Sequence, residues 1–173
     1  MNSLTTVAWV GAMLVAFPAA CSAQQGSIEP DQACVVSHVS DGDSFRCRNG
    51  WRVRLIGIDA PESQQRPFGA RSREGLHRMM PIGTRVRLER DVSLRDRYGR
   101  HLAYAWVGSI LINEAMVRDG WAVLYTVPPD VKYAERLRVA QNEARARRTG
   151  LWAEGGFGCL PSSFRRRECL SSP

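Results

Sequence analysis

The sequence predicts an α+β domain in which five strands close into a small β-barrel and three α-helices pack around it. Three observations lead to this fold class. Three strand-like segments joined by two tight turns occupy residues 34–56, two more strands follow a helical segment, and two helical segments come last. A meander completed by later strands is typical of small closed barrels. The 173 residues are enough for one such domain with a short extension.

The first three strands form the meander. Residues 34–39 (CVVSHV) have strand character, and Asp41-Gly42 is a hairpin signal that returns the chain into residues 44–48. Asn49-Gly50 is a second signal of the same kind and leads into the strand at residues 51–56. The two turns therefore predict three consecutive paired strands.

A helix separates this meander from the last two strands. Residues 69–80 are predicted to be helical, and Pro81 ends that helix. Residues 84–90 (TRVRLER) alternate apolar and charged side chains with a period of two, which is typical of a half-buried strand. A turn then leads into the fifth strand at residues 101–107 (HLAYAWV). This order matches a closed barrel of the OB type, an OB-fold.

Two further helices are expected after the barrel. Ser109 can cap a short helix at residues 111–119, and Gly120 suits its C-terminal end. Residues 131–148 place apolar side chains on one helical face. We expect the folded domain to span residues 33–153.

The N-terminal segment predicts an exported protein. Residues 1–23 carry no charged side chain, and an apolar run too short to span a bilayer ends in small residues that suit signal peptidase. We expect a signal peptide cleaved after Ala23, and a secreted or periplasmic mature protein. The missing basic residue near the start leaves a misplaced start codon as an alternative. Cys21 follows two alanines and makes a lipid-anchored form the less favoured variant.

Four cysteines remain after that cleavage: Cys34, Cys47, Cys159 and Cys169. An even number in an exported chain favours disulfides. Three pairings are possible, and the simplest joins Cys34 to Cys47 across the first hairpin and Cys159 to Cys169 within a tail at residues 154–173. A zinc site is the alternative, but no Cys-x-x-Cys pair and no nearby histidine support it.

The chain is strongly basic. Its formal net charge is +7, and Lys132 is the only lysine among 24 Lys and Arg residues. Arginine pairs with phosphate through a planar fork, and a positive surface attracts polyanions. A GC-rich genome would also favour arginine codons, so the charge suggests nucleic acid without proving it.

Two aspartates are placed to converge at one end of the meander. Asp43 follows the first tight turn, and Asp59 ends the third strand. Calcium accepts carboxylate oxygens, backbone carbonyls and water, so Asp43, Asp59 and the carbonyl of Ala60 are candidate ligands. Asp41 could orient a water ligand. For Asp41 and Asp43 alone, an ordinary hairpin turn is the simpler interpretation.

One further carboxylate and several arginines complete the candidate site. Glu62 could take a proton from water or position that water. Arg54 could bind a phosphate oxygen from its strand, and Arg100 could neutralise charge in the transition state. Tyr98 could stack on a base or ribose, and Arg97 could contact a flanking phosphate. Each would be an ordinary strand, loop or turn residue if it stood alone.

Four motifs resemble the staphylococcal nuclease (thermonuclease) family, in order and at similar spacing, over residues 33–153. They are DGDS at 41–44, RLIGIDAPE at 54–62, DRYGR at 96–100 and NEAMVRDG at 113–120. The resemblance implies an OB barrel with three helices and calcium-dependent endonuclease action on DNA and RNA, leaving 3′-phosphate ends. It also implies calcium ligation by Asp43, Asp59 and Ala60. Glu62 would be the general base, and Arg54 and Arg100 would bind phosphate.

The chain departs from the family pattern at several places. Ala60 and Ser44 stand where threonine is frequent, and the loop at residues 63–68 is shorter than in the best-known member. A shorter loop would alter the mobility of Glu62 and the contour of the substrate site. Residues 125–132 align poorly, so no nucleotide-stacking role is assigned to Tyr125. The cysteine-containing tail has no usable counterpart in the family.

These observations predict a calcium-dependent phosphodiesterase, a hydrolase that acts on DNA and RNA as a monomer with no protein partner implied. A non-catalytic barrel that binds nucleic acid is the alternative. Relatives of that kind usually lose the carboxylates or arginines, which this chain retains. A structural protein of the cell envelope, stapled by disulfides, is a third interpretation and predicts no dependence on calcium.

Overall fold

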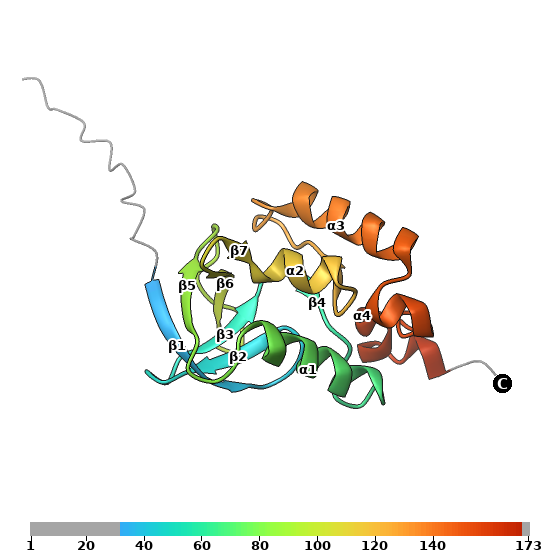
Figure 1. The fold of residues 1–173 in the computed structure, drawn as a ribbon, viewed down its shortest axis with the longest axis horizontal. Helices are drawn as coiled ribbons and strands as arrows, with labels where there is room; N and C mark the ends of the chain where they lie inside the picture. The colour runs from blue at the N-terminus through green and yellow to red at the C-terminus, as the bar shows by residue number, and fades with distance from the viewer. Residues whose placement is uncertain (1–31, 171–173) are drawn as a thin grey trace, which may run out of the picture.

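Five strands of the computed structural model close into a barrel (Figure 1). The structure describes residues 32–170, so the predicted signal peptide and Cys21 lie outside the described residues. The strand order is β3-β2-β1-β5-β6, and β6 closes the circle by pairing in parallel with β3. The strands are β1 (Gln32–Val39), β2 (Ser44–Cys47), β3 (Arg52–Leu55), β5 (Arg85–Glu89) and β6 (His101–Val107). The predicted α+β barrel is confirmed.

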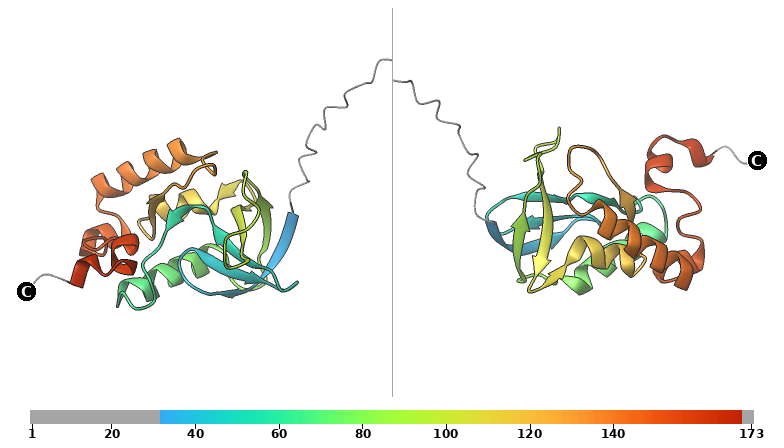
Figure 2. Two further views of the ribbon diagram at one scale, coloured as in Figure 1. Left: turned by 180° about the vertical axis from the view of Figure 1, so that it is seen from behind. Right: turned by 90° about the horizontal axis from the view of Figure 1, so that it is seen from above.

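Residues 32–170 contain four α-helices, of which three match the predicted ones. These are α1 (Phe68–Met79), α2 (Ile112–Arg118) and α3 (Ala134–Arg147). Two 3₁₀-helices, η1 (Gly150–Glu154) and η2 (Glu168–Leu170), flank the fourth helix, α4 (Pro161–Arg165). The sequence indicates only a tail where α4 and η2 form, because five residues are too few to show a hydrophobic period. The C-terminal helices lie at the end of the molecule away from β1 (Figures 1 and 2).

The third strand is shorter than the sequence predicts, and Asp59 does not end it. β3 stops at Leu55, and the chain changes direction into β4 (Gly57–Asp59). Gly57 has a φ of 78°, which favours glycine, and a Cβ there would lie 2.6 Å from Leu137 Cδ1. β4 pairs with β8 (Val123–Tyr125) in a separate two-stranded sheet, while β7 (Ile110–Leu111) extends the barrel sheet beside β6.

A buried asparagine fixes α2 to this change of direction. Asn113 is fully buried, and its side-chain amide donates to the Ile56 carbonyl oxygen at 2.8 Å. Its Oδ1 accepts a hydrogen bond from the Ala105 amide at 2.9 Å. A buried amide side chain is costly unless it is hydrogen-bonded. These bonds therefore join α2, β6 and the junction between β3 and β4, the segment that leads to Asp59.

The start of α3 is joined to the barrel at Glu89, the last residue of β5. The Tyr133 hydroxyl donates to Glu89 Oε1 at 2.9 Å, the Trp106 indole donates to Oε2 at 2.8 Å, and Lys132 forms an ion pair with the same carboxylate. Burial acts to raise the pKa of Glu89, but the hydrogen bonds from Lys132, Tyr133 and Trp106 outweigh it and lower the pKa. Glu89 therefore remains ionised and holds α3 in place.

Two disulfides follow the local pairing. Cys34 is bonded to Cys47 across β1 and β2, with Cα atoms 5.7 Å apart, and Cys159 is bonded to Cys169 with Cα atoms 5.8 Å apart. Two disulfides are compatible with an extracellular protein. Within the described part of the chain, no helix combines the length and the apolar character needed to cross a bilayer.

Candidate active site

A cavity of about 650 Å³ lies beside β3 and β4. Every residue that the sequence predicts for metal ligation, catalysis or substrate binding lines it. They are Asp43, Arg54, Asp59, Ala60, Glu62, Arg97, Tyr98 and Arg100. These residues come from the turn before β2, from β3 and β4, from the loop after β4 and from the turn before β6. The fold thus brings together groups that are up to 57 positions apart in the sequence, from Asp43 to Arg100.

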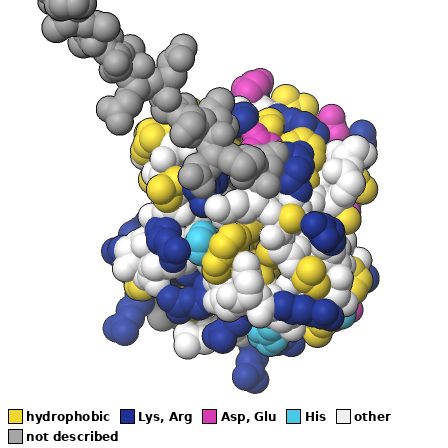
Figure 3. All heavy atoms as spheres, turned by 90° about the vertical axis from the view of Figure 1, so that its left-hand side faces the viewer, with side chains coloured by type: hydrophobic (Ala, Val, Ile, Leu, Met, Phe, Trp, Pro, Cys, Tyr) yellow, Lys and Arg dark blue, Asp and Glu magenta, His cyan; other side chains and the backbone are white. Residues whose placement is uncertain are grey.

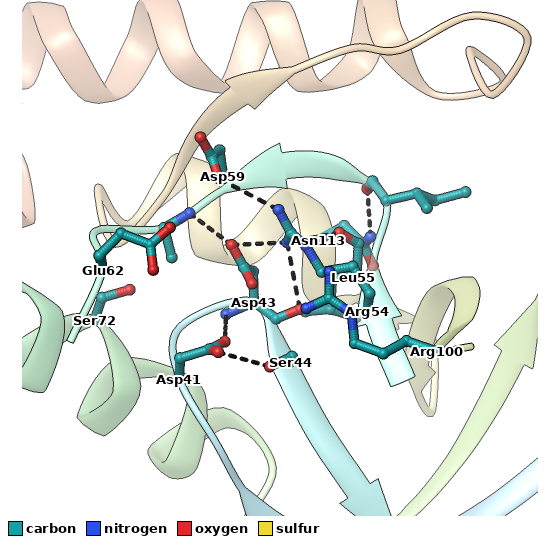
Figure 4. A network of polar contacts seen from close by, with 12 residues as sticks. Asp41, Asp43, Ser44, Arg54, Leu55, Asp59, Glu62, Ser72, Arg100 and Asn113 are labelled. Atoms are coloured by element: carbon teal, nitrogen blue, oxygen red, sulfur yellow. Dashed lines mark hydrogen bonds and ion pairs between the residues drawn. The ribbon is translucent and has the colours of Figure 1, made fainter. Parts of the chain in front are cut away.

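Arg54 lies between the two aspartates and holds them together (Figure 4). Its Nη1 is 2.7 Å from Asp43 Oδ2, and its Nη2 is 3.3 Å from Asp59 Oδ1. Nη1 also donates to the Leu55 carbonyl oxygen at 3.1 Å. The Arg54 side chain is only 13% exposed, so its charge interactions are weakly screened by solvent. The guanidinium therefore points into the site instead of away from the barrel.

The turn that presents Asp43 is built by its neighbours. Asp41 Oδ1 accepts a hydrogen bond from the Asp43 amide at 3.0 Å, and Oδ2 accepts one from the Ser44 hydroxyl at 2.7 Å. A Cβ at Gly42 would lie 1.8 Å from Ser72 Oγ on α1, so only glycine allows the turn to pack this closely. Asp41 is thus a turn residue, and its two oxygens are already engaged.

Asp43 is a buried carboxylate that lacks full charge compensation. It is 7% exposed, and its Oδ2 accepts a hydrogen bond from the Ala60 amide at 2.8 Å. Burial raises the pKa of Asp43 well above its ordinary value, while Arg54 acts in the opposite direction. Additional positive charge next to Asp43 would therefore be favourable.

The donor atoms at this place fit a calcium ion in type. Among residues 32–170, no three His, Cys, Asp or Glu side chains are grouped closely enough to hold a metal by themselves. Calcium also accepts backbone carbonyls and water beside its carboxylate ligands. Asp43 and Asp59 are close enough to share one guanidinium, and Ala60 directly follows Asp59 in the same cavity wall. Two carboxylates, a carbonyl and water form a set of hard oxygen donors.

Glu62 is held by a compact loop that precedes α1. Its amide donates to Gln65 Oε1 at 2.9 Å, and the Gln65 amide donates back to the Glu62 carbonyl oxygen at 2.8 Å. Gln65 itself is buried, whereas the Glu62 side chain is 39% exposed. The backbone of Glu62 is therefore fixed, while its carboxylate reaches the cavity.

Arg100 is oriented by Asp96 in the turn before β6. Arg100 Nε lies 2.6 Å from Asp96 Oδ2, and the amides of Tyr98 and Arg100 donate to Asp96 Oδ1 at 2.9 and 3.0 Å. Burial acts to raise the pKa of Asp96, but the bonds from Arg100 and Tyr98 outweigh it and lower the pKa. Arg97 and Arg100 both lie over the exposed ring of Tyr98, at 4.8 and 5.6 Å from its centroid. The turn thus places two guanidinium groups against one aromatic ring.

Several cavity residues do not follow from the sequence patterns, and two of them, Tyr125 and Arg165, lie close to the proposed catalytic groups. Tyr125 ends β8 and lines the cavity. Arg165 ends α4, and its guanidinium contacts the carboxylates of Asp59 and Glu62. The only sequence signal for Arg165 is a run of three arginines, and such a run usually indicates a solvated surface.

Exposed arginines also lie on barrel strands outside this cavity. Arg46 and Arg52 lie directly opposite each other on β2 and β3, and Arg85 is exposed on β5. Figure 3 shows the side of the molecule where β1 and β5 lie, with basic side chains spread over most of it and acidic ones mainly near the top. Like charges in directly opposed positions destabilise a sheet. An anion bound near Arg46 and Arg52 would therefore be favourable.

Comparison with known proteins finds similarity over the domain that carries the cavity. The family model described as "Staphylococcal nuclease homologue" matches residues 52–154. The thermonuclease of Staphylococcus hyicus is 33% identical over 131 residues, which cover 71% of this chain and 77% of the relative. A protein described as an uncharacterized endonuclease of Haemophilus influenzae is 36% identical over 157 residues, which cover 88% of this chain and 80% of the relative. Protein ParB of Escherichia coli is 37% identical over 131 residues, with coverage of 69% and 71%.

Proposed function

The chain belongs to the staphylococcal nuclease family, and from this premise we propose that it is a calcium-dependent nuclease. It hydrolyses phosphodiester bonds of DNA and RNA and leaves 3′-phosphate ends. The observation that carries this proposal is the cavity in which Asp43, Asp59 and Glu62 face Arg54 and Arg100. Relatives named thermonuclease and endonuclease support the reaction class.

Asp43, Asp59 and the carbonyl oxygen of Ala60 would hold the calcium ion. The raised pKa of Asp43 supports this role, because a cation would relieve the cost of a buried carboxylate. A calcium ion bound there would supply positive charge to the scissile phosphate. Ala60 has only a methyl side chain and contributes through its backbone. Its amide already holds Asp43 in place.

Glu62 accepts a proton from the attacking water, or orients that water, in this proposal. Its carboxylate is partly exposed at the cavity wall, where water can enter. A base positioned in this way typically contributes a factor of about 100 to 10,000 to the rate. The fixed backbone of the loop keeps the carboxylate at the cavity and so limits the reorganisation that catalysis requires.

Arg54 and Arg100 bind the phosphate oxygens on which negative charge increases. Arg100 uses Nε for its ion pair with Asp96, which leaves its terminal nitrogens suited to an anion. Guanidinium groups fixed by such partners stabilise the transition state without reorganising. Arg97 and Tyr98 contact the nucleotide next to the cleavage site, through a phosphate and through stacking. The enzyme acts as a monomer after export and signal-peptide cleavage.

The ends of the reaction products test this proposal. The oxidised chain is incubated with calcium and a 5′-labelled single-stranded DNA oligonucleotide, and the products are resolved before and after enzymatic removal of 3′-phosphates. We expect every product to change mobility after that removal, because the 5′ oxygen is the leaving group. Products that carry 3′-hydroxyl ends, and do not change mobility, would contradict the proposed cleavage direction.

A further inference from the structure

The C-terminal loop, residues 159–169, places the guanidinium of Arg165 against the carboxylates of Asp59 and Glu62. Arg165 Nη1 lies 2.9 Å from Asp59 Oδ1, and Nη2 lies 2.8 Å from Asp59 Oδ2. Nη1 also lies 2.8 Å from Glu62 Oε1. One guanidinium therefore binds both oxygens of the proposed metal ligand Asp59 and one oxygen of the proposed base Glu62.

This contact has the form of a specific ion pair. Two parallel N–H···O bonds from one arginine to one carboxylate are the strongest geometry for such a pair. The Asp59 side chain is only 1% exposed, although Arg165 itself is 41% exposed. The hydrogen bonds with Asp59, followed by that with Glu62, raise the pKa of Arg165 above its ordinary value. The pair is therefore buried on the carboxylate side and open to solvent on the arginine side.

Several contacts tie the C-terminal loop to the domain. The disulfide between Cys159 and Cys169 closes the loop, and the Gln65 side chain donates to the Cys159 carbonyl oxygen at 3.1 Å. Pro161, at the start of α4, is buried. The Arg165 guanidinium lies 5.9 Å from the centroid of the Tyr125 ring. Gln65 also binds the Glu62 amide, so the same residue anchors both the loop and the proposed base.

The neighbouring arginine shows that the contact is selective. Arg166 directs its Nε to Glu168 Oε1 at 2.5 Å, and its Nη2 lies 3.4 Å from Ser163 Oγ. Its contacts therefore remain inside the C-terminal loop. Arg165 alone in this loop lines the cavity. The segment that matches the family model ends at residue 154, so α4 lies beyond it.

We propose that Arg165 competes with the metal ion for Asp59 and Glu62, so that the C-terminal loop sets the affinity of the site for calcium. The inference rests on the proposed function for the identity of the ion. A guanidinium bound to both oxygens of Asp59 occupies lone pairs that a metal ion would use, and its positive charge repels the ion. While Arg165 is in place, its guanidinium also occupies Oε1 of Glu62. Calcium binding is therefore favoured when Arg165 withdraws from the cavity.

Calcium binding to the full oxidised chain tests this inference by isothermal titration calorimetry. If Arg165 holds the carboxylates in about nine molecules of ten, Arg165→Gln should lower the dissociation constant for calcium about tenfold. Arg166→Gln is the matched control, because it removes one positive charge from the adjacent position without touching Asp59 or Glu62. We expect its affinity to equal that of the parent chain.

A second variant tests whether the disulfide that closes the C-terminal loop holds Arg165 at the site. Cys159→Ser combined with Cys169→Ser opens the C-terminal loop and keeps Arg165, and circular dichroism checks that the domain stays folded. We expect this variant also to bind calcium more tightly than the parent. Unchanged or weaker calcium binding in Arg165→Gln would overturn the inference, as would a lower kcat at unchanged calcium affinity. If the parent and all variants cleave no DNA and bind no calcium, the proposed function itself fails.

Discussion

Replacing Glu62 with glutamine should lower kcat on single-stranded DNA about 100- to 10,000-fold, the range that a positioned general base contributes. Glutamine keeps the size of the side chain and can still accept a hydrogen bond from Arg165, but it cannot take a proton from water. The backbone bonds between Glu62 and Gln65 do not involve the carboxylate. The loop should therefore keep its structure, and KM should change little.

Initial rates at saturating calcium and varied DNA concentration measure this effect. Glu143→Gln on α3 is a suitable control, because its carboxylate has a similar exposure of 45% and pairs with Arg147 at the surface. The control should retain the activity of the parent chain. A decrease of less than tenfold in kcat for Glu62→Gln would show that another group takes the proton.

Replacing Arg100 with glutamine should lower kcat about 100- to 1,000-fold, as expected for the loss of one fixed donor to a charged transition state. Arg97→Gln is the natural comparison, since it removes the same charge from the same turn. We expect that change to raise KM a few-fold and leave kcat nearly constant, because Arg97 contacts a flanking phosphate in our account.

The two variants together separate chemistry from substrate binding. Arg100 also pairs with Asp96, so the thermal unfolding of both variants should be measured to exclude a loss of the turn. If Arg97→Gln lowers kcat as much as Arg100→Gln, the two arginines act only through general charge, and the assigned role of Arg100 is wrong.

Much of the barrel could be predicted because its signals are local. The tight turns at Asp41-Gly42 and Asn49-Gly50, and the alternation over residues 84–90, each fix an element over a few residues. The short elements could not be predicted, because a segment of three or four residues is too short to carry such a local signal. β8 has three residues, and β4 separates from β3 at Gly57, where the sequence looks like a continuous apolar strand.

The candidate site could be predicted as far as its residues belong to known motifs. All eight predicted residues line the cavity. What the sequence could not indicate is how the charges are paired within it. Asp59 pairs with Arg54, which lies five positions before it in the sequence, and with Arg165, which lies 106 positions after it. Such a pair depends on the path of a loop closed by a disulfide, and no periodic pattern encodes that path.

The structure gives a physical reason for two departures from the family pattern, Ala60 and the short loop after Glu62. Ala60 is buried and uses its backbone amide to fix Asp43, so a hydroxyl on its side chain is not needed for that contact. The loop forms hydrogen bonds that fix the backbone of Glu62. A short loop therefore suits a carboxylate that must stay at the cavity wall.

The central claim is that this cavity is the active site of a calcium-dependent phosphodiesterase. Its most direct test is whether calcium controls the cleavage of single-stranded DNA. The oxidised chain is assayed with calcium, then with an excess of chelator, and then with calcium restored. We predict cleavage that stops with the chelator and resumes with calcium. Cleavage that continues in the presence of the chelator would contradict the metal site. Salt-sensitive binding of DNA without cleavage in calcium would show that the protein is a non-catalytic nucleic-acid-binding barrel.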